Sequence, residues 1–90
     1  MDCTVNKHEK LLQFIILRRS DANVPFEGLC QLMLRLGFAV HIRGDHHIFT
    51  REDVEEIVNL QPVGSKAKTY QVKQVRGLIL RYQMTLGETK

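Results

Sequence analysis

The sequence predicts an α+β domain in which helices pack on a three-stranded antiparallel sheet, in the order α-α-β-β-β-α. Two segments with apolar residues at helical spacing come first, over about 7–19 and 25–36. Three short segments in which apolar and polar residues alternate then follow without an intervening helix: 38–43, 46–51 and 56–61. Strands that succeed one another in this way form a meander, and an amphipathic segment from Thr69 onward closes the domain as a last helix.

Length and composition restrict the chain to one small domain. Its 90 residues, of which 43% are hydrophobic and 26% charged, lie near the lower limit for a self-sufficient core. We expect a single domain over 1–90, with a helical N-terminal extension at about 6–20 and a core at about 25–84. No apolar run is long enough to span a bilayer, and the first residues lack the pattern of a signal peptide, so no membrane partner is expected. Two unpatterned cysteines, Cys3 and Cys30, favour the reducing cytoplasm.

Caps and apolar stripes define the first two helices. Asn6 and Glu9 have the spacing of an N-cap and its reciprocal carboxylate, which places a helix over about 7–19. Pro25 suits the first turn of the second helix, and Gly37 supplies the left-handed residue at which many helices end. The core side of this second helix is expected to hold Phe26, Leu29, Cys30, Met33 and Leu36.

Side-chain alternation predicts which face of the sheet is exposed. The core side is expected to hold Phe38, Val40, Ile42, Val58 and Leu60. In the second strand Arg51 is hard to bury, so we assign its face, which also holds His47 and Phe49, to the outside, although a large aromatic side chain usually prefers the core. Cations, imidazoles, amides and one aromatic ring would then share an open face that suits RNA: His41, Arg43, His47, Phe49, Arg51, Asn59 and Gln61.

Positive charge gathers toward the end of the chain, although the formal net charge is only +3. Lys66 and Lys68 lie in a small basic loop, and Thr69 can cap the last helix. That helix is expected to bury Val72, Val75, Ile79 and Tyr82 and to display Lys73, Arg76 and Arg81. Gly77 in its interior costs about 1 kcal/mol relative to Ala, which is tolerable if a neighbour packs close there. This end of the molecule should attract polyanions.

Three histidines, at 41, 46 and 47, are close enough in sequence for a metal site to be considered. Adjacent strand residues point to opposite faces, so His46 and His47 cannot bind one ion together, and no further ligands complete a set; we expect no metal and no cofactor. A single imidazole can still act as a general acid or base, and RNA whose own 2′-hydroxyl attacks the phosphate needs only proton transfer and nearby cations. Such groups could come from His47, Arg43, Lys66 and Lys68. Alternatively, His46 and His47 are simply polar strand residues.

The stretch Gly44-Asp45-His46-His47-Ile48-Phe49 resembles the HicA family, small toxins of HicA–HicB toxin–antitoxin pairs. The strand that ends at Gln61-Pro62 and the loop Gly64-Ser65-Lys66 extend the resemblance, which covers roughly 26–82. The family motif is a glycine, a small hydroxyl residue and then a histidine, on the second strand of a fold like a double-stranded RNA-binding domain. The resemblance implies a metal-independent mRNA endoribonuclease (an mRNA interferase) with one essential histidine, silenced by a HicB-like antitoxin that covers that histidine.

The resemblance also assigns residues. It places the catalytic histidine at His47 and the phosphate-binding basic loop at Lys66 and Lys68. Asp45 departs from the family, which has Ser or Thr there, and its carboxylate would repel phosphate and weaken catalysis. The expected RNA contacts are Arg43, Gly44, His46, Lys66 and Lys68. Two alternatives remain: a non-catalytic RNA-binding module of the same fold, and a protein-interaction domain that binds an antitoxin-like protein on the sheet.

Overall fold

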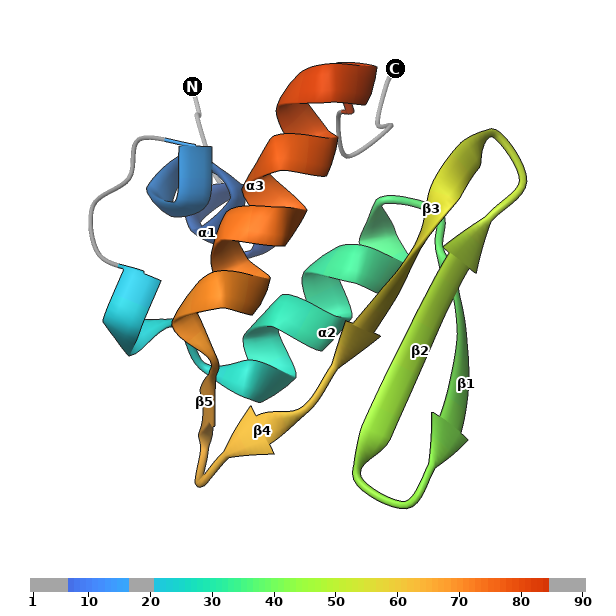
Figure 1. Cartoon of the computed structure of the whole chain (residues 1–90). Coiled ribbons are helices and arrows are strands. Elements are labelled where there is room, and N and C mark those ends of the chain that lie inside the picture. Colours follow the sequence, from blue (N-terminus) through green and yellow to red (C-terminus); the bar gives the residue numbers. More distant parts are fainter. Residues whose placement is uncertain (1–6, 17–20, 85–90) are drawn as a thin grey trace.

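A computed structural model describes residues 7–16 and 21–84 of the chain and shows the predicted α+β fold (Figure 1). The larger elements are α1 (Lys7–Ile16), α2 (Phe26–Arg35), β1 (Ala39–Arg43), β2 (His46–Arg51), β3 (Val54–Leu60) and α3 (Thr69–Tyr82). A 3-10 turn η1 (Asp21–Asn23) precedes α2, and a two-stranded hairpin of β4 (Pro62–Val63) and β5 (Lys66–Ala67) occupies the predicted basic loop. No helix in the described ranges is long and apolar enough to cross a membrane.

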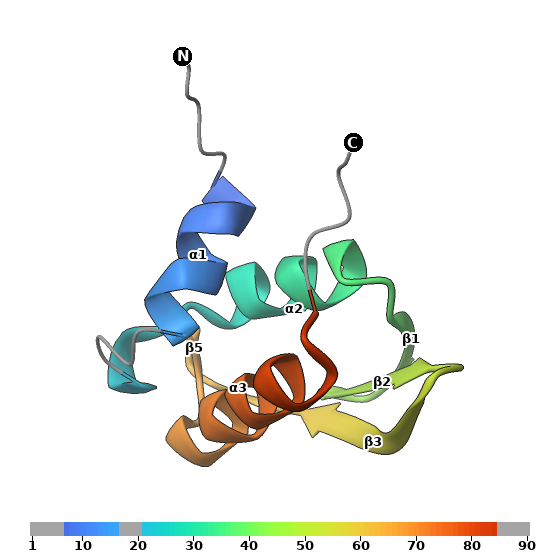
Figure 2. The ribbon, with the colours of Figure 1, turned by 90° about the horizontal axis from the view of Figure 1, so that it is seen from above.

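The first helix belongs to the common core. Leu12 and Ile15 of α1 are buried in one cluster with the apolar residues of α2, α3 and the sheet. Figures 1 and 2 show α1 on the side of α2 and α3 that is remote from β1 and β2. The predicted cap at Asn6 and the predicted continuation to Arg19 lie outside the described residues. The stripe on α2 is confirmed, with Phe26, Leu29, Met33 and Leu36 buried and Cys30 half-buried.

The three strands form a meander in the order β1-β2-β3, with both pairs antiparallel. β3 begins at Val54, two residues before the predicted start, because Glu52 and Asp53 alone make the turn. A β-bulge lies between Phe49 and Arg51 of β2. Since β1 and β3 are the two edge strands, β2 with its adjacent histidines runs through the middle of the sheet.

The face assigned to β2 was wrong. Phe49 is only 1% exposed and pairs with buried Val58, so the face of Phe49 and His47 is the one that the helices cover. Burial of an aromatic ring outweighs the reluctance of Arg51, which lies beyond the bulge and does not have to enter the core. Its guanidinium instead donates to the Leu36 carbonyl oxygen (2.8 Å) and pairs with Asp53 (2.7 Å). The open face of the sheet therefore carries His41, Arg43, His46, Ile48, Thr50 and Asn59.

The edge strand β1 is less covered than the alternation predicts. Val40 and Ile42 pair with Phe49 and His47 and share their face, yet Ile42 is 57% exposed and Val40 is also exposed. The helices bury the inner face at β2 and β3 but leave β1 in contact with solvent. In the third strand the prediction is confirmed, since Val58 and Leu60 are buried and Asn59 is exposed.

The last helix packs on β3 and corrects three details. Lys68, not Thr69, is the N-cap residue, and it makes no side-chain cap. Arg76 is not displayed: it is 5% exposed and its Nε donates to the Ile15 carbonyl oxygen of α1 at 3.0 Å. No atom of the described residues would lie within 4 Å of a Cβ at Gly77, so close packing among these residues does not explain this glycine. The apolar side is otherwise as predicted, with Val72, Val75 and Ile79 buried and Tyr82 half-buried.

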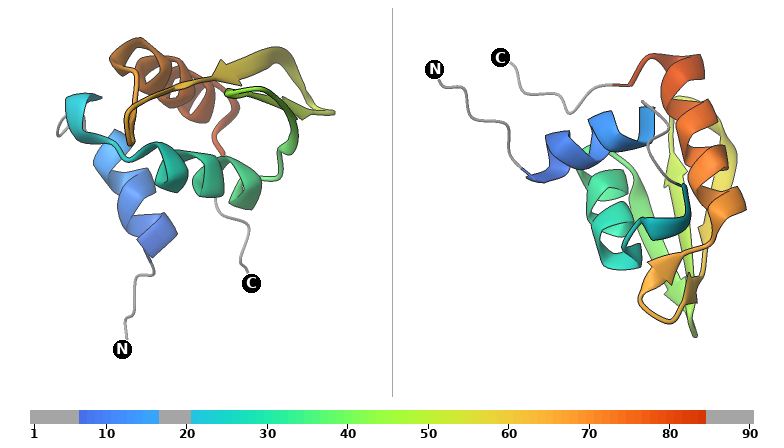
Figure 3. Two further views of the ribbon diagram at one scale, coloured as in Figure 1. Left: turned by 90° about the horizontal axis from the view of Figure 1, so that it is seen from below. Right: turned by 90° about the vertical axis from the view of Figure 1, so that its left-hand side faces the viewer.

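One end of the domain collects the polar segments singled out in the sequence. The β1–β2 turn, the β4–β5 turn and the start of α2 all lie at this end, which is the lower end in Figure 1 and in the right-hand view of Figure 3. Backbone hydrogen bonds fix the hairpin there, from Phe26 N to the Ser65 oxygen (2.9 Å) and from Ala67 N to the Val24 oxygen (2.8 Å). The fold thus brings the histidine turn and the basic loop to a common surface.

Candidate functional site

The β1–β2 turn directs its two histidines to opposite faces of the sheet. Gly44 has a φ of 63°, the left-handed conformation that this turn requires and that glycine adopts without strain. After the turn His46 pairs with Arg43, and His47 pairs with Ile42. Successive strand residues alternate in direction, so His46 joins the open face and His47 the helix-covered face. The two imidazoles therefore lie on different sides of the turn.

His47 stands at the rim of the core, beside the start of α2. Its half-buried ring meets the Phe26 ring edge-on, with centroids 5.0 Å apart and an interplanar angle of 80°. Nδ1 lies 3.4 Å from the Asp45 carbonyl oxygen, a long hydrogen bond in which the oxygen can only accept. This contact favours the tautomer with its proton on Nδ1, which leaves the lone pair on Nε2.

His47 also lines a shallow groove between α2 and the first two strands. The groove has a volume of about 280 Å³, and its floor and walls are largely apolar. Leu34, Val40 and Ile42 are exposed along it. Burial, and secondarily the charge of Glu27, raise the pKa of the half-buried Cys30 thiol in its wall to about 11, so this cysteine is a weak nucleophile at neutral pH.

His46 lies exposed on the open face, close to two oxygen acceptors. Its Nδ1 is 3.2 Å from Asn59 Oδ1, and its Nε2 is 3.8 Å from Asp45 Oδ1. Arg43 is exposed on the same face, directly across the strand pair. A cation and an imidazole therefore flank the turn on the side away from the helices.

A chain of side-chain hydrogen bonds ties the turn to the basic loop. Gln61 donates from Nε2 to Asp45 Oδ2 at 3.0 Å and accepts from Lys68 Nζ at 3.1 Å. The hydrogen bond from Gln61, with smaller contributions that include the nearby His46 and Lys68, lowers the pKa of the Asp45 carboxyl group. At neutral pH the turn thus holds one carboxylate whose charge these contacts stabilise, and Lys68 is held close to it.

Buried Gln71 holds the backbone on both sides of the link between Asn59 and Gln61 and so supports these hydrogen bonds. It accepts a hydrogen bond from Gln61 N at 3.2 Å and donates to the Asn59 carbonyl oxygen at 3.3 Å. The roles of Gln61 and Gln71 were not predicted from the sequence. A signal for Gln71 was available, because it lies four residues before Val75 on the buried side of the last helix.

Lys66 is connected to the turn through the backbone at the start of α2. It is exposed on β5, whose backbone bridges to Pro25 at the start of α2. The next residue, Phe26, carries the ring that contacts His47. Lys66 is therefore linked to the His47 side of the turn, whereas Lys68 is linked through Gln61 to the His46 side.

Several residues expected at an RNA surface are elsewhere. Phe49 is buried in the core, and the guanidinium of Arg51 donates to the Leu36 carbonyl oxygen at the end of α2. Neither side chain can therefore contact a ligand on the open face. Arg81 pairs with Glu56 at 2.9 Å. Four of the sequence-predicted site residues lie at the β1–β2 turn, namely Arg43, Gly44, His46 and His47. Lys68 is connected to the turn through Gln61, and Lys66 is linked to it through the backbone bridge to Pro25.

Within the described ranges no group of three or more His, Cys, Asp or Glu side chains could hold a metal ion.

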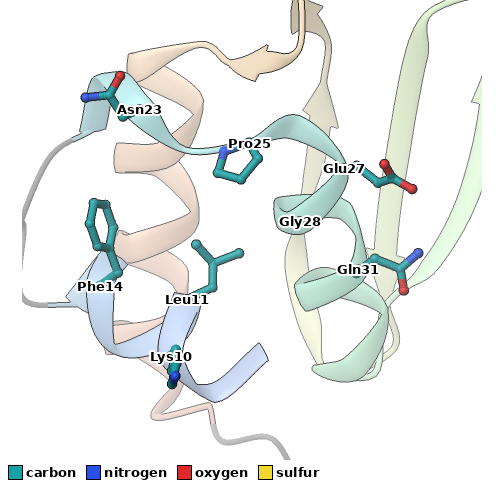
Figure 4. A pocket seen from close by; sticks show the side chains of 8 residues that line it. All are labelled: Lys10, Leu11, Phe14, Asn23, Pro25, Glu27, Gly28 and Gln31. Atoms are coloured by element: carbon teal, nitrogen blue, oxygen red, sulfur yellow. The ribbon is translucent and has the colours of Figure 1, made fainter. Parts of the chain in front are cut away.

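A second depression, of about 760 Å³, lies between α1 and the start of α2. Figure 4 shows its lining: Lys10, Leu11 and Phe14 come from α1, Asn23 lies above Phe14 in this view, and Pro25, Glu27, Gly28 and Gln31 lie toward α2. The lining residues that the structure describes include one cation and one carboxylate.

Comparison with models of known protein families, with curated proteins and with solved structures gives no match to this chain. The function proposed below is therefore inferred from the contacts at this end of the domain and from the resemblance of residues 44–49 to the HicA motif.

Proposed function

We propose that this chain is a cytoplasmic mRNA endoribonuclease, the toxin of a type II toxin–antitoxin pair, with His47 as its general acid and base. The observation that carries the proposal is that the β1–β2 turn holds two imidazoles and the guanidinium of Arg43, and that hydrogen bonds connect it to the ammonium group of Lys68. Lys68 is tied to this turn through Gln61 and Asp45. The backbone of Lys66 bridges to Pro25, the residue before Phe26, whose ring contacts His47. Together with the HicA-like motif, this arrangement supports RNA cleavage without a metal.

The proposed reaction needs one mobile proton. His47 Nε2 accepts the proton of the RNA 2′-hydroxyl as that oxygen bonds to the adjacent phosphorus. The bond from phosphorus to the 5′-oxygen then breaks, and the imidazolium returns the proton to this leaving oxygen. The products are a 2′,3′-cyclic phosphate and a free 5′-hydroxyl. Arg43, Lys66 and Lys68 supply positive charge where the phosphorane becomes more negative.

A protein partner is part of the proposal. The groove beside His47 continues into exposed apolar side chains of α2 and β1, namely Leu34, Val40 and Ile42. Apolar side chains grouped in this way are typical of surfaces that a partner covers. A HicB-like antitoxin that filled the groove would at the same time cover His47 and block access of RNA.

The proposal is tested by inducing the chain in growing cells and following growth and mRNA integrity. We expect arrest and mRNA loss with the wild type but not with His47→Ala. His41→Ala is the matched control, because it removes an exposed imidazole of the same sheet outside the proposed site, and it is expected to remain toxic. Equal harmlessness of all three chains, or equal toxicity of wild type and His47→Ala, would contradict the assignment.

Asp45 favours a second candidate function, that of a non-catalytic RNA-binding module. Its carboxylate lies beside His46 and the proposed phosphate position and opposes the approach of an anion. This candidate predicts RNA affinity that falls steeply with salt, together with intact RNA after long incubation. A protein-interaction domain, which the apolar groove would suit, predicts no salt-sensitive RNA binding.

A further inference from the structure

Tyr70, in the first turn of α3, is the one strongly exposed aromatic side chain among residues 7–16 and 21–84. It is 63% exposed, whereas the four phenylalanines and Tyr82 are buried or half-buried. Exposure of one apolar side chain is common and by itself indicates nothing. Its surroundings distinguish Tyr70 from the other exposed apolar residues.

The ring of Tyr70 contacts a cation that belongs to the proposed site. Lys68 Nζ lies over the ring, 6.0 Å from its centroid. The same nitrogen donates to Gln61, which in turn holds Asp45 in the histidine turn. Lys73 is exposed three residues further along the helix, on the same side as Tyr70. An exposed aromatic ring with one ammonium group over it, and a second lysine one helical turn further on, is thus connected through Lys68 and Gln61 to the histidine turn.

We propose that Tyr70 is the stacking platform for one unpaired base of a single-stranded RNA, next to the position of cleavage. The inference rests on the proposed function for the identity of its ligand and adds a subsite to it. In an extended RNA strand, bases and phosphates alternate, and the alternation of Tyr70 with Lys68 and Lys73 matches that chemistry. A base inside a duplex is already stacked on its neighbours, so the platform selects single strands over double-stranded RNA. Every base has a π-face, so the subsite tolerates any sequence.

Binding of an uncleavable RNA tests this subsite apart from catalysis. The probe is a labelled 2′-O-methyl octanucleotide, which has no free 2′-hydroxyl to attack the phosphate. Tyr70→Ala is expected to weaken its binding roughly 5- to 150-fold, the range found when one stacking aromatic is removed, and Tyr70→Phe is expected to preserve it. Leu80→Ala is the matched control, because Leu80 is also an exposed apolar side chain (52%) but lies near the other end of the same helix. It is expected to bind like the wild type.

Two further probes separate base stacking from charge. Inorganic polyphosphate carries the anions without the bases, and wild type and Tyr70→Ala are expected to bind it equally. The sequence has two tyrosines, Tyr70 and Tyr82, and no tryptophan, so a Tyr82→Phe chain reports the fluorescence of Tyr70 alone. We expect the octanucleotide to quench this emission, after correction for its own absorbance, and polyphosphate to leave it unchanged.

The outcomes distinguish failure of the subsite from failure of the function. If the wild type binds the octanucleotide but Tyr70→Ala binds it equally well, the stacking inference is overturned while RNA binding stands. The stacking inference is likewise overturned if a duplex of the same sequence binds as tightly as the single strand. Absence of any salt-sensitive RNA binding by the wild type would overturn both.

Discussion

Gly77→Ala provides a quantitative test of how α3 is built. Gly77 lies exposed inside the helix, and no atom of residues 7–16 or 21–84 is within 4 Å of the position that a Cβ would occupy. The added methyl group therefore meets no steric cost, and the change gains the difference in helix propensity, about 0.8–1 kcal/mol. For a domain of this size, such a gain raises the melting temperature by roughly 4–8 °C. It also raises the urea midpoint by roughly 0.3–1 M at an unchanged denaturant slope.

Gly64→Ala is the matched control, because a Cβ there also meets no atom of the described part of the chain within 4 Å. The backbone differs: Gly64 has a φ of +62°, where an L-residue costs roughly 1–2 kcal/mol. Urea unfolding followed by far-ultraviolet circular dichroism should therefore move the two midpoints in opposite directions. If the Gly77→Ala chain were no more stable than the wild type, with the same denaturant slope, the conclusion that an added methyl group at this position meets no steric cost would be refuted.

Three further changes probe buried or paired groups. The hydrogen bond from the Tyr82 hydroxyl, together with nearby charge, lowers the pKa of Glu56. Tyr82→Phe should therefore lower the free energy of unfolding at pH 7, as measured by urea titration. The difference from the wild type should shrink as the pH falls below the ordinary carboxyl range, near 4, because Glu56 then becomes protonated. Arg76→Met should cost roughly 1.5–3 kcal/mol of unfolding free energy in the same assay, because the buried guanidinium donates to the backbone of α1. In a Cys3→Ser chain, Cys30 should react with iodoacetamide on the order of 100-fold more slowly than a free thiol at pH 8, since burial raises its pKa to about 11; a rate like that of free cysteine would contradict this.

The order of elements was predictable because it is encoded in local periodicity. The three- and four-residue spacing of Phe26, Leu29 and Met33 can bury one side of a helix only, and the structure buries that side. Three consecutive alternating segments likewise leave little choice but an antiparallel meander. The small β4–β5 hairpin was not foreseen, since strands of two residues are too short to show an alternation.

The faces of the sheet were less predictable, because alternation defines two faces without saying which one is covered. In β2 the choice depended on Arg51 and Phe49, and the sequence does not show that Arg51 can reach the Leu36 carbonyl oxygen. Arg76 is a similar case: its partner, the Ile15 carbonyl oxygen, is 61 residues away in the sequence. Long-range partners of this kind decide where a cation is placed, and local patterns do not reveal them.

The sequence predicted the charged residues of the candidate site but not the hydrogen bonds that connect them. Lys66 and Lys68 were recognised from the basic loop, and His46 and His47 from the turn. The hydrogen bonds of Gln61 to Asp45 and Lys68 depend on how the end of β3 meets the turn, which only the folded chain shows.

Cleavage of a defined RNA by the purified chain is the most direct test of the proposed function. The substrate would be an end-labelled single-stranded RNA in buffer with EDTA, compared with the same RNA carrying one 2′-deoxy sugar at the mapped cleavage position. We predict products with a 2′,3′-cyclic phosphate, no cleavage at the 2′-deoxy position, and a loss of at least about 100-fold in rate for His47→Ala. RNA left intact by the wild type, or cut equally well by His47→Ala or at the 2′-deoxy position, would contradict the proposal.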